Sequence, residues 1–203
     1  MNVVTVMGSP HRQGTTHQVL TWVESALTEA GHEVRRFDLT DYVVRGCLAC
    51  NRCQNDESGT AAGAPACAQD DDANLILGAV QSAAAFVLAT PVYCWGMTSQ
   101  LKALVDRTYC VTREGDDERA YLFSGRRGGL LVTAAGGLER NAELLVAPFE
   151  ELMRYHHCVD AGHLLVPHCT GAEHLGESVR EHAVSFARRL VGRREVAPTD
   201  IRE

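Results

Sequence analysis

The sequence predicts a doubly wound α/β fold, in which five parallel strands form one sheet that helices cover on both faces. Apolar, β-branched runs of strand length alternate along the chain with amphipathic segments of helix length. No internal repeat interrupts this alternation, and no linker is long enough to divide the chain. Strands that alternate with helices pair in parallel through right-handed crossovers, so we expect a single domain over residues 1–203.

The individual elements follow in order along the chain. The first strand, residues 3–7, is apolar and β-branched, which is typical of a central strand buried on both faces. An amphipathic helix over residues 15–30 comes next and ends at Gly31. Further strands are predicted at 33–38, 84–89, 129–133 and 159–166, and further helices at 73–81, 98–108, 140–156 and 173–191. We expect the flavodoxin-like strand order, because its switch point brings together the loops after the first, third and fourth strands.

Composition excludes several classes of protein. The 203 residues are 45% hydrophobic, which is enough to bury a sizeable core without disulfides. The net charge of -7 argues against a nucleic-acid partner, which would require a basic surface. The arginines near the C-terminus are interpreted as the solvated face of the last helix and a tail over residues 193–203; they are Arg188, Arg189, Arg193 and Arg194. With no signal peptide and no apolar run of transmembrane length, we expect a cytoplasmic protein without a membrane partner.

The segment from Gly8 to Thr16 directly follows the first strand and has the composition of a phosphate site. Its glycines are expected to let the loop turn tightly, which leaves backbone N–H groups and hydroxyls free to face an anion. The helix that begins near Thr15 adds the positive end of its dipole. No Lys follows Gly14, so this is not a Walker A loop, and the spacing is not that of a dinucleotide fold. A hydroxyl-rich loop with little fixed charge suits a phosphomonoester such as flavin mononucleotide (FMN).

Three segments together carry a family resemblance: residues 8–16, 90–107 and 133–137. In order and separation they resemble the flavin-contacting segments of the NAD(P)H-dependent FMN reductase and flavodoxin-like quinone reductase family. The resemblance implies a phosphate site made of Ser9, His11, Gln13, Gly14, Thr15 and Thr16. It implies that the isoalloxazine ring is wrapped by Pro91, Val92, Tyr93, Trp95, Gly96 and Met97, and closed on its other side by Ala135, Gly136 and Gly137. The family loop commonly has Arg in place of His11 and Asn in place of Thr15, and both replacements keep a donor.

The ring segment also has a physical logic of its own. An isoalloxazine needs apolar packing surface beside free backbone donors and acceptors, and we expect Tyr93 and Trp95 to supply the first and the turn at Gly96 the second. The alternative is that both aromatics merely cap a strand end, but their position after a buried strand and Pro91 favours the ring. Further matches to the family pattern are interpreted as helix-surface and subunit-contact residues of a homodimer or homotetramer; they are Lys102, Asp106 and Arg107.

A cysteine loop is expected between residues 46 and 67, inserted after the second strand. Cys47, Cys50 and Cys53 are spaced by three, as in ferredoxin runs that ligate iron, and Cys67 follows fourteen residues after Cys53. The loop resembles that of the iron-sulfur flavoproteins, a branch of the same family, which implies a [4Fe-4S] cluster on these four thiols. The spacer 54–66 is longer than in that branch, so zinc, four reduced thiols or a redox-active Cys47 and Cys50 pair remain alternatives. The other cysteines are interpreted as packing residues: Cys94, Cys110, Cys158 and Cys169.

The sequence gives little support for a histidine metal site, a phosphatase or a serine hydrolase. Histidines gather in the C-terminal third without a ligand spacing, so we expect no metal site there. None of the eight cysteines is followed six residues later by Arg, as a low-molecular-weight phosphatase requires, and there is no Gly-x-Ser-x-Gly elbow.

The resemblance therefore implies an FMN-dependent oxidoreductase. It would take hydride from NADH or NADPH as co-substrate and pass electrons to a flavin, quinone or similar small acceptor, with no catalytic side chain. One alternative is a flavodoxin-like or iron-sulfur flavoprotein electron carrier that a protein donor reduces. Another is a redox or metal sensor in which the cysteine loop is the active part.

Overall fold

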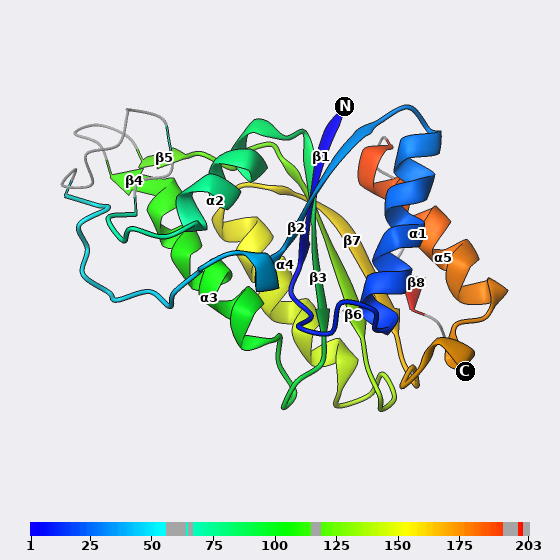
Figure 1. Ribbon diagram of the computed structural model, residues 1–203. Helices are drawn as coiled ribbons and strands as arrows, with labels where there is room; N and C mark the ends of the chain where they lie inside the picture. Colours follow the sequence, from blue (N-terminus) through cyan, green and yellow to red (C-terminus); the bar gives the residue numbers. More distant parts are fainter. Residues whose placement is uncertain (56–63, 65–66, 115–118, 193–198, 201–203) are drawn as a thin grey trace.

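The protein is described by a computed structural model that covers residues 1–55, 64, 67–114, 119–192 and 199–200. One parallel sheet runs through its centre (Figure 1). The strand order is β2 (Glu33–Asp38), β1 (Asn2–Met7), β3 (Ala85–Pro91), β6 (Arg127–Thr133), β7 (Val159–Val166) and the two-residue β8 (Thr199–Asp200). Every pair in this sheet is parallel, so all the strands end at the same edge.

Helices cover both faces of the sheet (Figure 1). On one face lie α1 (Thr15–Glu29) and α5 (Glu177–Val191), and on the other lie α2 (Ala73–Ser82), α3 (Ser99–Arg107) and α4 (Val146–Tyr155). Short 3-10 turns connect them at Leu39–Asp41, Thr108–Val111, Ala142–Leu145 and Ala172–His174. No helix in the described parts of the chain is both long enough and apolar enough to cross a membrane.

The central strand β1 divides the core into two clusters. Val4 and Val6 pack with α2, α3 and α4, whereas Val3 and Met7 pack with α1 and α5. All four side chains are nearly or fully buried, as the alternation of an extended strand between two helical layers requires. The predicted central strand is confirmed.

The predicted doubly wound sheet is confirmed, with five main strands in the flavodoxin-like order. Two helices begin later than expected, because the predicted helices 140–156 and 173–191 open with the 3-10 turns before α4 and α5. The antiparallel pair of β4 (Thr112–Glu114) and β5 (Arg119–Tyr121) was not predicted, and residues 115–118 between the two strands lie outside the described residues. Nor was β8 predicted, which pairs with β7 from within the expected tail 193–203. These strands have two or three residues, too few for an alternation to be visible.

Candidate functional site

The strand order creates a switch point between β1 and β3. These two strands are neighbours, yet β1 leads to α1 on one face and β3 leads to α3 on the other. Loops that diverge in this way leave a crevice at the carboxyl edge of a parallel sheet. A cavity of about 260 Å³ lies there, lined by Ser9, His11, Gln13, Gly14, Thr15, Thr16, Pro91, Tyr93, Thr170 and Gly171. The structure thus brings all six predicted phosphate residues together with two predicted ring residues.

The loop after β1 is held against the neighbouring strand and helix. The Gly8 N–H donates to the Ala89 carbonyl at 2.8 Å, and the Thr98 hydroxyl donates to the Gly8 carbonyl at 2.7 Å. A Cβ atom on Gly8 would lie 2.7 Å from the Cβ of Leu101, so glycine is required here for close approach to α3. Neither Gly8 nor Gly14 has a positive φ, but the Gly14 N–H donates to the His11 carbonyl at 3.2 Å and closes a turn in this loop, as expected.

The hydroxyls around the cavity differ in how firmly they are held. Thr16 is buried and shares a 2.6 Å hydrogen bond with the Thr133 hydroxyl, which fixes the start of α1 to β6. The Ser9 hydroxyl accepts from the His11 N–H at 3.2 Å. Thr15 donates to the Cys169 carbonyl at 3.4 Å, a long and therefore weak bond. The Thr15 hydroxyl is thus the most easily redirected toward a ligand in the cavity.

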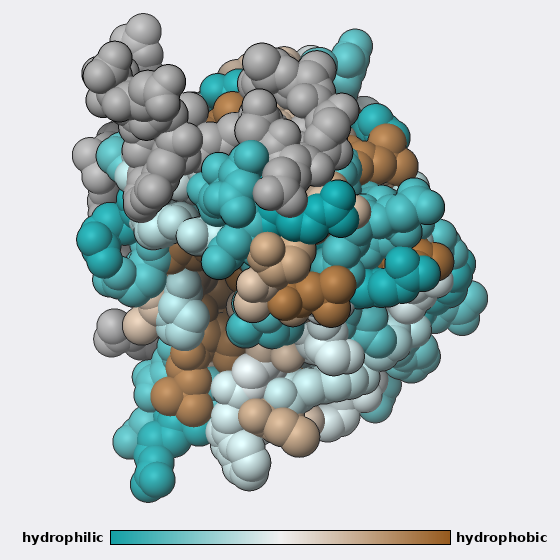
Figure 2. All heavy atoms as spheres, turned by 90° about the vertical axis from the view of Figure 1, so that its left-hand side faces the viewer, coloured by the Kyte–Doolittle hydropathy of each residue, from teal (hydrophilic) through white to brown (hydrophobic). Residues whose placement is uncertain are grey.

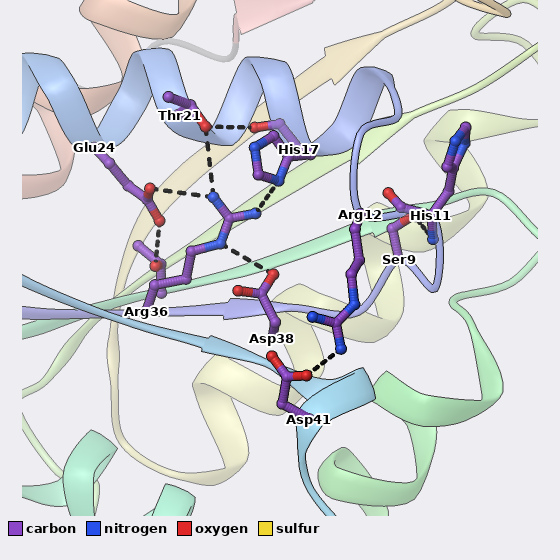
Figure 3. Close-up of polar contacts among 10 residues, drawn as sticks. Ser9, His11, Arg12, His17, Thr21, Glu24, Arg36, Asp38 and Asp41 are labelled. Carbon is purple, nitrogen blue, oxygen red and sulfur yellow. Dashed lines mark hydrogen bonds and ion pairs between the residues drawn. The ribbon is translucent and has the colours of Figure 1, made fainter.

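Fixed charges beside the cavity are neutralised by partners (Figure 3). Arg12 forms an ion pair with Asp41. Arg36 lies 3.1 Å from Asp38 and donates to the His17 ring nitrogen at 2.8 Å. Burial lowers the pKa of His17, and the charge of Arg36 lowers it further, so His17 is neutral near pH 7. An anion in this cavity would therefore meet mainly neutral donors, as the loop composition predicts.

A tight hairpin follows β3 and stands at the rim of the cavity. Tyr93 and Gly96 exchange backbone hydrogen bonds of 2.9 and 3.0 Å around Cys94 and Trp95, whose φ angles are 47° and 60°. Two positive φ angles at central residues define a type I′ turn, and each costs about 1–2 kcal/mol in a residue other than glycine. Trp95 is 69% exposed and Tyr93 49% exposed, so both offer apolar surface.

The Gly96 N–H closes the hairpin on the Tyr93 carbonyl, so a donor that this turn offers to a ring must be another backbone group, and the expectation of such donors stays a prediction. One prediction about this hairpin is wrong. Cys94 is not a packing residue, because it is exposed at the tip of the turn.

The loop after β6 lies at the same edge of the sheet. The Ala134 N–H donates to the Val166 carbonyl at 2.9 Å, and the His168 N–H donates to the Gly136 carbonyl at 3.0 Å. Ala135, Gly136 and Gly137 therefore sit beside the loop that follows β7. The remaining predicted ring residues do not line the cavity itself; they are Val92, Trp95, Gly96, Met97, Ala135, Gly136 and Gly137. Thr170 and Gly171 also line the cavity but were not predicted, because they follow β7 and match no motif.

The cysteine segment runs beside α3, along the left-hand side of the molecule in Figure 1. Figure 2 shows this side face on, where hydrophobic and hydrophilic residues are interspersed. Cys47 and Cys50 are exposed, whereas Cys53 and Cys67 are half-buried. Within the described chain, no three Cys, His, Asp or Glu side chains are gathered closely enough to hold a metal ion. Of the spacer 54–66, residues 56–63 and 65–66 lie outside the described residues.

The donor chemistry of this segment nevertheless fits an iron-sulfur cluster. Three of the four sulfurs already accept N–H hydrogen bonds, Cys47 from the Ala49 backbone at 3.4 Å and Cys53 from the Gln54 side chain at 3.7 Å. Cys67 accepts from Arg107 at 3.1 Å. Burial raises the pKa of Cys53, and the neighbouring Cys67 raises it further, so these two thiols lie within electrostatic reach of each other. N–H donors to sulfur are what tunes a ligating thiolate.

The prediction for Arg107 is wrong. Its side chain is fully buried and paired with Asp71, whereas Lys102 and Asp106 are exposed and form an ion pair of 2.6 Å on the surface of α3. The burial of Arg107 was indicated by its spacing of three from Leu104 and six from Leu101, because these three residues share the buried face of α3.

The remaining thiols and the buried histidine are structural. Cys110 and Cys169 are buried, and burial raises the pKa of the half-buried Cys158 to about 12. His156 is buried and shares a 2.9 Å hydrogen bond with the Thr108 hydroxyl.

Comparison with known proteins gives the site its context. One relative, an iron-sulfur flavoprotein of Methanocaldococcus jannaschii, is 33% identical over 108 residues, which is 53% of this chain and 52% of the relative. A second iron-sulfur flavoprotein of that organism is 31% identical over 141 residues, 70% of this chain and 64% of the relative. This chain thus spans about half of the first relative's length and less than two thirds of the second's.

The fold has solved counterparts as well. The NAD(P)H:quinone oxidoreductase of Methanothermobacter marburgensis superimposes with a TM-score of 0.71 at 18% identity, over 97% of this chain and 99% of that one. The family model described as NADPH-dependent FMN reductase matches residues 1–168. This match covers all three loops at the switch point, and the chain belongs to the NADPH-dependent FMN reductase family.

Proposed function

We propose that this chain binds FMN at the switch point and transfers electrons from NADH or NADPH to a flavin, quinone or similar small acceptor. The observation that supports it most is the 260 Å³ cavity, which unites the six residues of the β1 loop with Pro91 and Tyr93 at the start of α1. A cavity with neutral donors beside a helix N-terminus suits a terminal phosphate.

Different residues would hold the phosphate and the ring of FMN. Ser9, Thr15 and the backbone of the β1 loop would hold the phosphate, with the His11 side chain beside them in the cavity wall. The exposed faces of Tyr93 and Trp95 would pack beside the ring. When bound, FMN supplies the hydride chemistry, so no side-chain acid or base is needed. The rigid type I′ hairpin fixes the ring-side wall before a ligand arrives, which reduces the entropy lost on binding.

The experiment is anaerobic reduction of the FMN-loaded chain. We expect NADH or NADPH alone to bleach the flavin absorbance, and a quinone or free flavin to restore it. Reduction by a ferredoxin, with no reduction by either nucleotide, would instead identify an electron carrier.

A second proposal concerns the cysteine segment. We propose that Cys47, Cys50, Cys53 and Cys67 bind a [4Fe-4S] cluster, which the three N–H bonds to sulfur and the names of the relatives support. Anaerobically purified protein should be brown and contain about four irons per chain. Serine at any of the four should abolish the cluster, while serine at Cys110 should not, and FMN should remain in all variants. Zinc in place of iron, or yellow and fully active iron-free protein, would refute the cluster.

The assembly of the chain is also a proposal. We propose a homodimer or homotetramer, which light scattering on the eluted protein would test.

A further inference from the structure

We propose that Arg107 is a positioning residue for the cysteine site, which holds the Cys67 sulfur in place and ties both ends of the cysteine segment to α3. The inference rests on the cluster proposed above and adds a residue that no cysteine spacing would identify.

The contacts of the Arg107 guanidinium carry the argument. Its Nε donates to the Cys67 sulfur at 3.1 Å, and its Nη1 donates to the Arg45 carbonyl at 2.9 Å. Its Nη1 and Nη2 donate to the two Asp71 carboxylate oxygens at 2.8 and 2.9 Å. Both side chains of this pair are completely buried. The planar guanidinium of Arg107 therefore binds the Asp71 carboxylate in bidentate geometry, and it also donates to the Cys67 sulfur and the Arg45 carbonyl.

Asp71 completes the connection from the opposite side. Its carboxylate accepts from the Arg45 N–H at 2.9 Å and from the Ala73 N–H at 3.1 Å. Burial alone would raise the pKa of Asp71, but the hydrogen bonds from Arg107 and these two N–H groups outweigh it and lower the pKa. The carboxylate is therefore charged, and the buried guanidinium is compensated.

The contacts explain how a distant cysteine can be a ligand. Arg45 lies two residues before Cys47, and Cys67 is the last cysteine of the segment, so Arg107 contacts both of its ends. The Cys67 main chain is fixed as well, because its N–H and carbonyl bond to the Asn74 side chain at 3.1 and 2.7 Å. Cys67 is thus held at sulfur, N–H and carbonyl, whatever the length of the spacer. The position of this proposed fourth ligand is therefore set by α3, through Arg107, and by α2, through Asn74, rather than by the loop that leads to it.

The experiment compares Arg107→Lys with Arg52→Lys, the same substitution at an exposed position within the cysteine segment. Lysine keeps the charge beside Asp71 but lacks the fork that reaches Cys67 at the same time. In competition with a chelator, we expect the Arg107→Lys cluster to hold its iron with roughly 10- to 100-fold lower affinity, as for other partners of metal ligands. Its reduction potential should fall, because an N–H donor to sulfur favours the more negative, reduced cluster. FMN content should match that of the unaltered chain.

A second measurement does not depend on the folding of a variant. With ¹⁵N-labelled arginine in the unaltered chain, pulsed EPR of the reduced cluster should detect a weakly coupled nitrogen, and Arg52→Lys should retain that coupling. The absence of coupled nitrogen, or an Arg107→Lys cluster with unchanged potential and stability, would overturn the role of Arg107 alone. An unaltered chain without iron would overturn the cluster and this inference together, while leaving the FMN proposal standing.

Discussion

Replacement of Thr15 by valine tests the phosphate site most directly. Valine keeps the β-branched shape and a similar helix propensity, so only the hydroxyl is lost. The hydroxyl makes one long bond of 3.4 Å to the Cys169 carbonyl, so we expect little change in the free energy of unfolding. A hydrogen bond to a charged group contributes about 1.5–3 kcal/mol, which corresponds to a roughly 10- to 150-fold weaker affinity for FMN.

The assay is titration of flavin-free protein with FMN and with riboflavin, followed by the quenching of flavin fluorescence. Riboflavin lacks the phosphate, so its affinity for the Thr15→Val variant should stay unchanged. The control is Thr28→Val at the other end of α1, where the exposed hydroxyl bonds only the Glu24 carbonyl at 2.9 Å. Equal losses for both flavins, or no loss for FMN, would refute the assignment of the phosphate to this loop.

Three further predictions concern stability and reactivity. Trp95→Gly relieves a positive φ of 60°, so the free energy of unfolding should rise by up to about 1 kcal/mol while FMN affinity falls; a lower melting temperature would contradict this. Burial lowers the pKa of His156 to about 4, so the unfolded chain binds the proton first, and stability should fall by about 3 kcal/mol as the pH drops from 6.5 to 4. Urea unfolding would detect this loss, which should persist in the exposed-site control His174→Gln and shrink in His156→Gln. In iron-free protein, iodoacetamide should label the exposed Cys47 well before Cys158, as peptide mass spectrometry would show; equal rates would contradict the burial of Cys158.

Much of the fold could be predicted because the central strands β1, β3 and β6 are buried on both faces. Such a strand appears in the sequence as a continuous apolar run, as residues 129–133 of β6 do. The strands β4, β5 and β8 are too short to show a period, and what defines them is pairing with a partner distant in the sequence or separated by a polar turn. Local pattern cannot supply that information.

The candidate site was predictable where it depends on one continuous segment. The β1 loop lines the cavity as expected, but Thr170 and Gly171 reach it only because β7 ends beside α1. Arg107 was misread because a charged residue on an amphipathic helix is usually solvated, and its burial depends on Asp71 from another part of the chain. The exposure of Cys94 could not be predicted, because the turn type is not evident in a hairpin without Asn-Gly.

Helix α3 has a consequence for how the two proposed redox sites are spaced. Its N-cap, Thr98, is bonded to the Gly8 carbonyl of the phosphate loop, and its last residue, Arg107, holds Cys67. The helix has nine residues and so measures roughly 13 Å. A rigid helix of this length would fix the separation between the proposed flavin site and the proposed cluster site, and with it the distance over which electrons would pass. One residue inserted in α3 would turn Arg107 away from Cys67 by about 100° and disconnect the two centres, even though every proposed ligand of both remained in the chain.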